Sequence, residues 1–304
     1  MNYAREETPY RELYRERRRL EEFERLARIL KASSTKMDLV QWTERNRVLK
    51  GQRFSFKDRD YLLPIYLDTH LNIIVVKARQ MEMTEMLVNW LLFNLSKYSN
   101  TTALYTAPRA DQVSRFSRDR IRRAIKDSPS LRRNLEVARK GEGKEAIARI
   151  PFANDSLLYL VSAWSDFSAI RNIPADFAAV DEMQDVQSEA LPVIMEAMSH
   201  SEHRRLVLVG TASEVGSEFH RLWETSDMKE WNREAKKWVP TKPENKLYSG
   251  YHISQEMAPW IITLPPDHPN SIEAKRPPAY SERRFLNEVL GMFYAGMAKP
   301  LLTE

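Results

Sequence analysis

The stretch LNIIVVKARQMEMTEM, residues 71–86, decides the fold of this chain. Its apolar run Ile73–Val76 is typical of a buried β-strand, and the segment from residue 84 onward is typical of a helix. A short turn joins the two. A strand, a tight turn and a helix in this order predict one unit of an α/β fold, with the N-terminus of the helix at the end of the strand.

The turn carries side chains expected of a phosphate-binding loop, in an unusual order. The pattern G-x-x-x-x-G-K-[ST] surrounds the phosphates of ATP with backbone N–H groups, a lysine and a hydroxyl. Here Met83 and Glu82 stand in the slots of the lysine and the second glycine, whereas Lys77 comes seven residues before Thr84. The segment is therefore a variant phosphate loop, a broken one, or an ordinary strand–turn–helix. As a phosphate loop it would contact nucleotide through Lys77, Ala78, Arg79, Gln80, Met81, Glu82, Met83, Thr84 and Glu85.

An acidic pair follows a second apolar strand. Asp181 and Glu182 come directly after Phe177–Val180. This is the Walker B form, in which the aspartate holds Mg²⁺ and the glutamate orients or deprotonates the attacking water. On this interpretation Thr84 and Asp181 hold the metal and Glu182 is the catalytic base. An apolar strand followed by Asp-Glu also occurs by chance.

Two further segments supply candidate site residues. The strand in LVLVGTAS, residues 206–213, ends in Thr211, Ala212 and Ser213, which are placed to sense hydrolysis of the γ-phosphate and pass it on. The alternative is a glycine turn with solvated hydroxyls. Arg171, ten residues before the acidic pair, is either an arginine finger, in cis or toward a neighbouring subunit, or a surface ion-pair partner.

The segment upstream of the loop is a candidate site for the adenine base. Aromatic rings sandwich bases, but core packing is at least as good an interpretation for Tyr61 and Tyr66. The aromatic residues of this segment, and the polar residues among them, are Phe54, Phe56, Tyr61, Tyr66, Gln52 and Arg59.

A basic helix is predicted over Ala110–Lys126. At α-helical spacing Arg115, Arg118 and Arg122 share a face, and Arg109 precedes the helix. Such a face suits the phosphodiester backbone of DNA, in contacts that are independent of sequence and sensitive to salt. The alternative is a solvated face, because the net charge of +5 permits nucleic-acid binding without arguing for it.

The apolar runs alternate with amphipathic segments. This alternation predicts a mostly parallel sheet with helices on both faces and its ligands at the carboxyl ends of the strands, so that the motifs form one site. The predicted strands are Ile73–Val76, Ala103–Thr106, Ser156–Ser162, Phe177–Val180 and Leu206–Val209.

The two ends of the chain have a different character. Within an N-terminal segment, residues 1–45, an amphipathic helix is predicted over residues 9–32, either solvated at the domain edge or docked on a partner subunit. From Trp238 the chain is rich in proline and aromatic residues and is predicted to be irregular and partly extended. A short helix or strand is predicted near Phe285–Leu290.

Composition narrows the class of protein. The chain has 304 residues, of which 42% are hydrophobic, so it can bury a core. No run of 18 apolar residues exists, so neither a membrane-spanning helix nor a membrane partner is expected. The absence of cysteine excludes disulfides and thiolate metal sites.

These motifs, in this order, resemble the ATPase domain of the terminase large subunit of tailed phages. KARQMEMTE is similar to that family's variant Walker A, TAPRADQVSRFSRDRI to its second strand–helix segment, AAVDEMQD to its Walker B, and VGTAS to its coupling motif. YHISQEMAPWI and FLNEVLGMFY are similar to the segments that come after the coupling motif in terminases. The resemblance implies an ASCE-type P-loop NTPase domain over residues 46–304 that hydrolyses ATP with Mg²⁺. It places phosphate binding on Lys77 and Arg79.

The resemblance also implies partners and a place of action. These are double-stranded DNA, the portal of a procapsid, a terminase small subunit and further copies of the chain in a ring, in the host cell cytoplasm during viral assembly. Glu82 departs from the family's glycine. The chain stops near the expected start of an RNase H-like nuclease domain, and we expect no nuclease activity. The rival hypotheses are a non-hydrolysing P-loop scaffold that binds DNA or a capsid partner, and a helicase-like ATPase.

Overall fold

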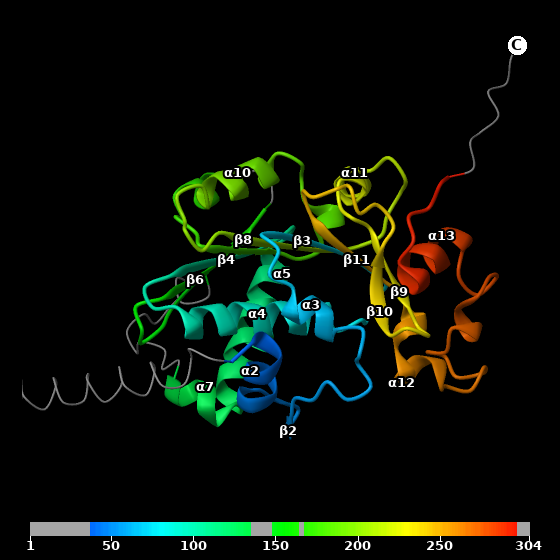
Figure 1. Ribbon diagram of the computed structural model, residues 1–304, viewed down its shortest axis with the longest axis horizontal. Coiled ribbons are helices and arrows are strands. Elements are labelled where there is room, and N and C mark those ends of the chain that lie inside the picture. The colour runs from blue at the N-terminus through cyan, green and yellow to red at the C-terminus, as the bar shows by residue number, and fades with distance from the viewer. Residues whose placement is uncertain (1–36, 135–147, 164–166, 297–304) are drawn as a thin grey trace, which may run out of the picture. The chain divides into compact units, whose positions relative to one another are not determined.

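The computed structural model describes residues 37–134, 148–163 and 167–296 (Figure 1). The chain divides into two compact units, Met1–Asp38 and Leu39–Glu304, and the second holds every helix and strand of the described residues. The helix predicted over residues 9–32 lies outside the described residues. No helix in the described part of the chain has the length and apolar character needed to cross a membrane.

A mostly parallel sheet forms the centre of the described residues, which confirms the predicted fold class. The strands lie in the order β10-β9-β11-β3-β8-β7-β4-β6-β5. The parallel strands are β3 (Asn72–Lys77), β4 (Thr102–Ala107), β6 (Leu157–Ser162), β7 (Phe177–Val180), β8 (Arg205–Thr211) and β11 (Ser249–Ile253). Antiparallel pairs border them through β5 (Arg149–Pro151), β9 (Lys229–Asn232) and β10 (Lys237–Pro240). A separate hairpin pairs β1 (Val48–Leu49) with β2 (Gln52–Arg53).

Helices cover both faces of the sheet. Figure 1 shows α10 and α11 above it and α2, α3, α4 and α7 below it. The longer helices are α2 (Leu39–Asn46), α4 (Met83–Lys97), α5 (Ala110–Arg115), α7 (Pro129–Asn134), α10 (Ala190–Ala197) and α11 (Glu218–Glu224). The shorter ones are α3 (Leu63–Leu67), α6 (Arg123–Asp127), α9 (Ser168–Arg171), α12 (Pro259–Ile262), α13 (Glu282–Phe285), η2 (Met183–Asp185), η3 (Gln255–Met257) and η4 (Glu273–Lys275). Two π-helices, η1 (Phe116–Arg122) and η5 (Leu286–Leu290), complete the set.

Helix α4 is the central helix of the core. It is buried almost all round, as expected for a helix with apolar residues on every face that packs between a sheet and further helices. Its first turn directly follows the loop at the end of β3, so packing of α4 fixes where that loop lies. The position of a candidate phosphate loop is thus set by one of the best-packed helices of the described chain.

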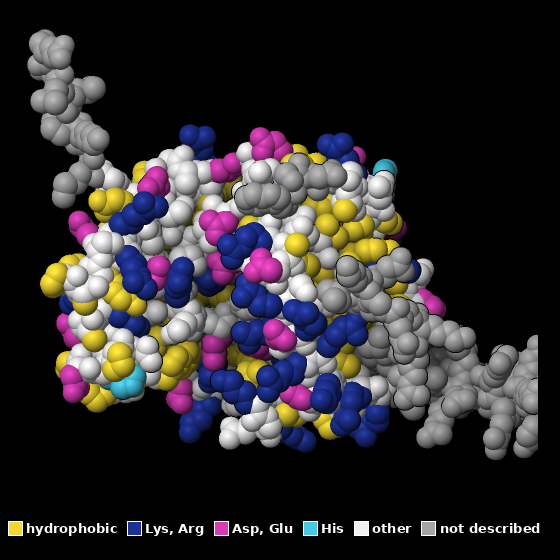
Figure 2. All heavy atoms as spheres, turned by 180° about the vertical axis from the view of Figure 1, so that it is seen from behind, with side chains coloured by type: hydrophobic (Ala, Val, Ile, Leu, Met, Phe, Trp, Pro, Cys, Tyr) yellow, Lys and Arg dark blue, Asp and Glu magenta, His cyan; other side chains and the backbone are white. Residues whose placement is uncertain are grey.

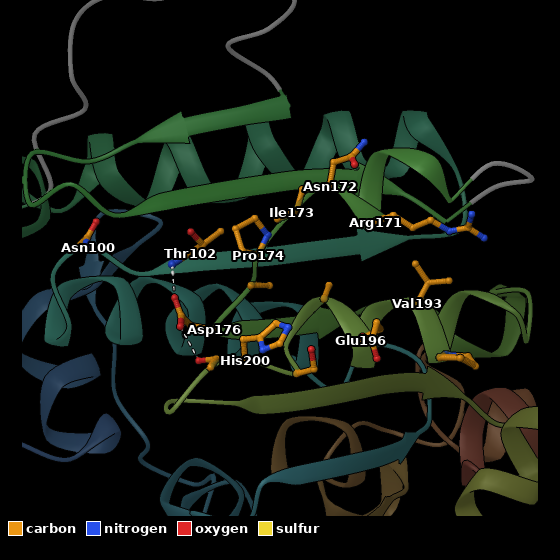
Figure 3. Close-up of a pocket in the computed structure, with 15 residues that line it drawn as sticks. Asn100, Thr102, Arg171, Asn172, Ile173, Pro174, Asp176, Val193, Glu196 and His200 are labelled. Carbon is orange, nitrogen blue, oxygen red and sulfur yellow. Dashed lines mark hydrogen bonds between the residues drawn. The ribbon is translucent and has the colours of Figure 1, made fainter.

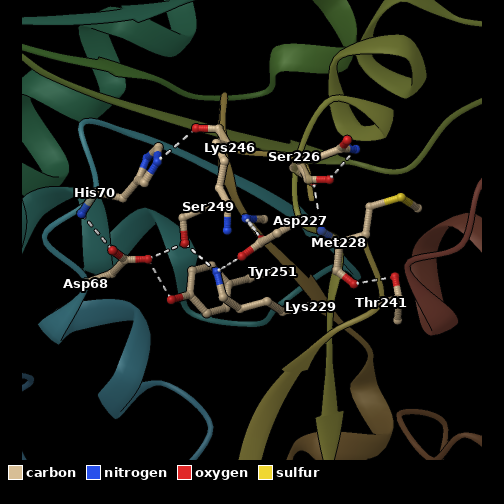
Figure 4. Close-up of polar contacts among 12 residues, drawn as sticks. Asp68, His70, Ser226, Asp227, Met228, Lys229, Thr241, Lys246, Ser249 and Tyr251 are labelled. Carbon is tan, nitrogen blue, oxygen red and sulfur yellow. Dashed lines mark hydrogen bonds and ion pairs between the residues drawn. The ribbon is translucent and has the colours of Figure 1, made fainter. Parts of the chain in front are cut away.

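The prediction of an irregular segment after Trp238 is wrong for Ser249–Ile253. This stretch is β11, an interior strand that pairs in parallel with β3. Its polar residues are buried because they have partners: the carboxylate of Asp68 accepts hydrogen bonds from the hydroxyls of Ser249 and Tyr251 (Figure 4). A strand whose buried polar groups are satisfied in this way lacks the apolar run by which a buried strand is predicted from sequence.

Of the short helix or strand predicted near Phe285–Leu290, the structure shows the helix, as α13 and η5. It ends at Gly291, whose φ of 70° is the left-handed conformation that glycine adopts most easily. An added Cβ there would lie 2.7 Å from the carbonyl oxygen of Ile253 and 2.9 Å from the backbone nitrogen of Ala78. Glycine therefore lets this segment approach β11 and the loop after β3.

Candidate nucleotide-binding site

Lys77 lies at the carboxyl edge of the sheet, between two neighbouring strands. It is the last residue of β3, is 6% exposed and pairs in register with Thr211 at the end of β8. Its Nζ donates a hydrogen bond to Thr211 Oγ1 at 3.1 Å and lies 3.9 Å from Glu182 Oε1. The structure thus brings the lysine of the first motif beside residues of the second and third.

The loop after Lys77 has a strained backbone that its surroundings hold in place. Gln80 and Glu82 have φ values of 62° and 59°, which cost non-glycine residues roughly 1–3 kcal/mol each. Backbone N–H groups of Ala78 and Arg79 donate to the carbonyls of Ile253 (2.7 Å) and Glu288 (2.8 Å). Because β11 and η5 supply these acceptors, the conformation of the loop depends on the C-terminal part of the chain.

The unusual loop residues face away from the phosphate side. Met81 and Met83 are 1% exposed and pack in the core, so the residue in the usual lysine slot has a packing role. Glu82 forms a paired ion contact with Arg59, in which Arg59 Nη2 donates to Glu82 Oε1 at 2.9 Å. Arg59 also stacks over the ring of Trp260. The carboxylate in the glycine slot is thereby neutralised beside the loop.

Glu85 was predicted to contact nucleotide, and its carboxylate instead connects two arginines. Glu85 Oε2 accepts from Arg47 Nη2 at 2.9 Å, and Oε1 accepts from Arg120 Nη1 at 2.7 Å. Arg47 is only 1% exposed, and burial lowers its pKa although the nearby Glu85 carboxylate raises it. Glu85 therefore ties α4 to the arginine-rich helix and to the N-terminal edge of this unit.

Asp181 and Thr84 offer two oxygen ligands to a hard cation. Thr84 Oγ1 and Tyr105 OH each donate to Asp181 Oδ2 at 3.3 Å. Asp181 is 5% exposed, and burial and the charge of Glu182 raise its pKa to about 6, against the opposing effect of Lys77. A buried carboxylate beside a hydroxyl fits Mg²⁺, which binds through few protein oxygens plus substrate phosphates.

Glu182 points into the pocket from a left-handed backbone. Its φ is 53°, and its side chain is 33% exposed. Its Oε2 accepts a hydrogen bond from Gln184 Nε2 at 2.8 Å. Gln184 was not predicted as a site residue. Its position two residues after Glu182 is the one feature of the sequence that could have indicated this contact.

Thr211, Ala212 and Ser213, the predicted coupling residues, line the same pocket. The carbonyl of Ser213 accepts hydrogen bonds from Asn287 Nδ2 at 2.6 Å and from the N–H of Tyr294 at 2.9 Å. The end of β8 is therefore bonded to the C-terminal segment as well as to Lys77.

The pocket has a volume of about 880 Å³, within the range of small-molecule sites. Basic residues line much of it, which suits a polyphosphate. The far wall is formed by α13, η5 and the residue before them, where a short helix or strand was predicted but no site residue was. The lining consists of Lys77, Arg79, Gln80, Thr84, Arg109, Gln112, Glu182, Gln184, Asp185, Thr211, Ala212, Ser213, Ser281, Arg283, Arg284, Asn287 and Glu288.

Gln52, Arg59 and Arg171 are among the predicted site residues that do not line this pocket. Gln52 is exposed in the β1–β2 hairpin, and Arg59 contacts Glu82 from outside the pocket. Arg171 does not line this pocket but lines a second cavity of about 870 Å³, together with Thr102 at the start of β4 and Asp176 before β7 (Figure 3). Within one subunit Arg171 is therefore not brought to the nucleotide pocket, and a role toward a neighbour stays a prediction.

The aromatic residues upstream of the loop pack together in the core. The rings of Phe54 and Phe56 lie 5.2 Å apart, and those of Phe56 and Tyr66 lie 4.7 Å apart. Tyr61 and Tyr66 are 2% and 4% exposed. Core packing is thus the interpretation that the structure supports for these rings, and they are not available to sandwich a base.

The arginine-rich helix is not a continuous α-helix, and this changes which arginines share a face. Its centre is the π-helix η1, in which hydrogen bonds span five residues instead of four. As a result Arg115, Arg120 and Arg123 line one hollow of about 610 Å³ beside Asp181, whereas Arg118 and Arg122 do not. Figure 2 shows Lys and Arg side chains gathered on the lower part of one face of the molecule.

Comparisons with known proteins bear on the family and on the fold of this chain. A family model for "Phage terminase large subunit gpA, ATPase domain" matches residues 65–237. A comparison with curated proteins finds no match. The fold is similar to the Thermus phage P74-26 large terminase ATPase domain, at 15% identity and a TM-score of 0.57, over 76% of this chain and 92% of that one.

Two longer proteins share the fold. The large terminase of bacteriophage HK97 matches at 15% identity and a TM-score of 0.56, over 84% of this chain and 54% of that one. The large terminase of the thermophilic bacteriophage D6E, in complex with ADP, matches at 13% identity and a TM-score of 0.56, over 79% of this chain and 54% of that one. The chain therefore spans about half the length of these two proteins.

Proposed function

We propose that this chain, which belongs to the family of phage terminase large subunit gpA ATPase domains, hydrolyses ATP and uses the energy to move double-stranded DNA into a procapsid. The observation that carries the proposal is the meeting of three motifs in one basic pocket. Lys77 Nζ lies 3.9 Å from Glu182 Oε1, and Thr84 Oγ1 lies 3.3 Å from Asp181 Oδ2. Lys77 Nζ also lies 3.1 Å from Thr211 Oγ1. Together the three distances join residues at the ends of β3, β7 and β8, at the edge where α/β sheets bind ligands.

The charged and polar residues of the pocket are assigned to separate parts of the proposed reaction. Lys77 and Arg79 bind phosphate oxygens, and the N–H groups at the start of α4 add the positive end of a helix dipole. Thr84 and Asp181 would hold Mg²⁺ through their side-chain oxygens. When bound, Mg²⁺ neutralises charge on the phosphates and polarises the γ-phosphoryl group.

Glu182 is the proposed general base. Water attacks the γ-phosphorus and forms a new P–O bond, while its proton passes to the Glu182 carboxylate. The bond from the γ-phosphorus to the bridging oxygen breaks, and ADP leaves with the electron pair. Arg79 from the same chain, or Arg171 from a neighbouring subunit, supplies further positive charge to the transferring group.

Movement would pass from the pocket through the end of β8. Thr211 contacts Lys77, and Ser213 is bonded to Asn287 and Tyr294 of the C-terminal segment. A change at the γ-phosphate would therefore reach a segment that also binds the phosphate loop. This proposal gives Thr211, Ala212 and Ser213 their coupling role.

A steady-state ATPase assay with Mg²⁺ tests the reaction. We expect Glu182→Gln to lower the rate by about 100-fold or more while ATP binding persists, since the lost group acts in the proton transfer. Glu189→Gln, an exposed carboxylate nearby that does not line the pocket, is the control and should retain the wild-type rate. An unchanged rate for Glu182→Gln would overturn the assignment of the base.

DNA binding is assigned to the arginine-rich helix. Arg109 lines the nucleotide pocket and Arg115 lines the adjoining hollow, so a DNA backbone on this helix would lie close to the site of hydrolysis. The residues proposed to contact DNA are Arg109, Arg115, Arg118 and Arg122.

Binding of duplex DNA at several salt concentrations tests this surface. We expect Arg115→Ala, Arg118→Ala and Arg122→Ala together to weaken binding and to reduce the slope of log K against log salt by up to about 3. The control removes three exposed cations around the β9–β10 hairpin, Arg233, Lys236 and Lys237. An equal loss in both variants would show that only overall charge matters.

The wider assembly belongs to the same proposal. A ring of copies acting at a procapsid portal, with a small subunit, in the host cell cytoplasm, would give Arg171 a neighbour to face. Sedimentation of the protein with ATP and DNA measures whether copies associate. A strictly monomeric species under conditions of full ATPase activity would contradict a finger supplied by a neighbour.

A non-hydrolysing scaffold is the second candidate. Glu82 and Met83 in the glycine and lysine slots favour it. The ion pair of Glu82 with Arg59 weakens the objection that this carboxylate repels phosphate. If the wild-type protein binds ATP but does not hydrolyse it, the scaffold hypothesis is favoured over the ATPase.

A further inference from the structure

Four residues form a closed circuit at the end of β8. Lys77 Nζ donates to Thr211 Oγ1 at 3.1 Å, and the backbone N–H of Thr211 donates to Gln184 Oε1 at 2.8 Å. Gln184 Nε2 donates to Glu182 Oε2 at 2.8 Å, and Glu182 Oε1 lies 3.9 Å from Lys77 Nζ. The circuit connects the ends of β3, β7 and β8 through four side chains and the backbone N–H of Thr211.

We infer that Gln184 is a positioning residue, which orients the carboxylate of Glu182 and ties it to the first residue of the coupling segment. The inference rests on the proposed function, because it assumes that Glu182 is the base. It adds a residue that was not among the predicted site residues, and a route by which the base and the end of β8 move together.

The chemistry of the amide suits this position. A carboxylate only accepts hydrogen bonds and a backbone N–H only donates one, so the group between Glu182 and Thr211 must donate on one side and accept on the other. The glutamine side chain does both with its two ends. Gln184 Nε2 also lies 3.1 Å from Asp185 Oδ2, which uses its second hydrogen.

The strand opposite is shaped to admit this amide. A Cβ added to Gly210 would lie 3.0 Å from Gln184 Oε1 and 2.7 Å from the ring of Phe219. Any larger residue would push the amide or the ring away, so glycine at this strand position allows the close approach. The Gln184 amide therefore fits against the end of β8 because position 210 has no side chain.

The effect of the contact is on the orientation of the base. The Glu182 side chain is 33% exposed, so without a partner its carboxylate would rotate into solvent. Gln184 fixes one of its oxygens, and Lys77 faces the other. A base held in one orientation raises the rate of proton transfer with little effect on substrate binding.

Gln184→Glu tests the inference by replacing the N–H donor with a negatively charged acceptor of the same shape. The new carboxylate keeps the shape and still accepts from the N–H of Thr211, but it repels Glu182. We expect kcat to fall roughly 10- to 100-fold, whereas KM and the Kd for ATP should rise only about three- to fivefold, the effect of one added carboxylate in the pocket. Gln187→Glu introduces the same charge at an exposed position close by and should leave both constants unchanged.

A swapped pair gives a second readout that does not depend on catalysis. Gln184→Glu should lower the Tm, and combining it with Glu182→Gln should restore it, because the amide at position 182 then donates to the carboxylate at position 184. Recovery in the double variant supports the contact even if wild-type protein proves inactive, in which case only the proposed function fails. Wild-type kcat and Tm for Gln184→Glu would overturn the inference, as would a double variant no more stable than the single one.

Discussion

The guanidinium of Arg79 lies 3.4 Å from the carboxylate of Glu288, which ties the phosphate loop to the C-terminal helical segment. The same carboxylate lies 3.1 Å from Arg284 Nε. Both arginines line the nucleotide pocket and both are at least half exposed, whereas the Glu288 side chain is 20% exposed. One acidic side chain thus offsets the charge of two cations available to a polyphosphate.

Replacing Glu288 with glutamine should tighten ATP binding. Loss of the carboxylate frees Arg79 and Arg284 for phosphate, and an effect of about 1 kcal/mol corresponds to roughly fivefold in Kd. Calorimetric titration with a non-hydrolysable ATP analogue measures it. Glu273→Gln, which breaks the exposed pair with Arg276 outside the pocket, is the control. Unchanged or weaker binding for Glu288→Gln would contradict the prediction.

Removal of Arg59 should weaken ATP binding by exposing the charge of Glu82. We expect Arg59→Ala to raise Kd about three- to fivefold, since the carboxylate at the start of α4 then repels phosphate. Arg59→Ala combined with Glu82→Gln should recover wild-type affinity, because the net charge of the pair is restored. Arg53→Ala, at a nearby exposed position, controls for the loss of a cation. Failure of the double variant to recover would assign the effect to Arg59 itself.

Alanine at Gly291 should destabilise the protein more than alanine at Gly216. Both glycines have positive φ, 70° and 81°, so both substitutions carry a backbone cost of about 1 kcal/mol. An added Cβ clashes with backbone atoms only at Gly291, and overpacking adds about 1–3 kcal/mol. Urea unfolding of the two variants measures the difference. Equal losses would show that the close approach to Ile253 and Ala78 is unimportant.

His252 should make stability depend on pH. Burial lowers the pKa of His252, but the hydrogen bond and charge of Glu230 and the carbonyl of Leu290 outweigh it, so the pKa is raised. A raised histidine pKa stabilises the fold fully below the unfolded value of about 6.5, and this contribution is lost as pH rises through the folded value.

Thermal unfolding of Glu230→Gln checks this relation. The variant should melt about 2 °C below wild type at pH 6, which corresponds to roughly 0.5–1 kcal/mol, and the gap should close toward pH 9. Glu234→Gln removes an exposed carboxylate from the same hairpin and serves as the control. A gap that is constant across this pH range would exclude the histidine as its source.

The central strands were predictable because they are buried on both faces. Strands such as β7 (Phe177–Val180) and β3 are continuous apolar runs. Such runs are typical of parallel strands that helices cover on both faces of the sheet. Strand β11 escaped prediction because its small and polar residues are satisfied by partners outside the strand, such as Asp68, which is far away in the chain. Partners at that separation leave no local pattern.

The site residues divide in the same way. Lys77, Asp181 and Thr211 were predicted to meet because each ends or follows a parallel strand, and the carboxyl ends of parallel strands share one edge. The partners of Glu82 and Arg79 were not predictable, since Arg59 and Glu288 come from segments without a motif. The faces of the arginine-rich helix were predicted at α-helical spacing, and the π-helix shifted them.

The sequence by itself determined the parallel sheet and which polar residues follow each strand, because burial and strand order act through local apolar patterns. Only the tertiary structure decided which oxygen and nitrogen atoms come within bonding distance. Those contacts depend on strand register, on positive-φ turns and on the docking of the C-terminal segment against the loop after Lys77. Such features arise from packing between distant segments, and so the pairing of Gln184 with Glu182 and Thr211 is established only once the chain is folded.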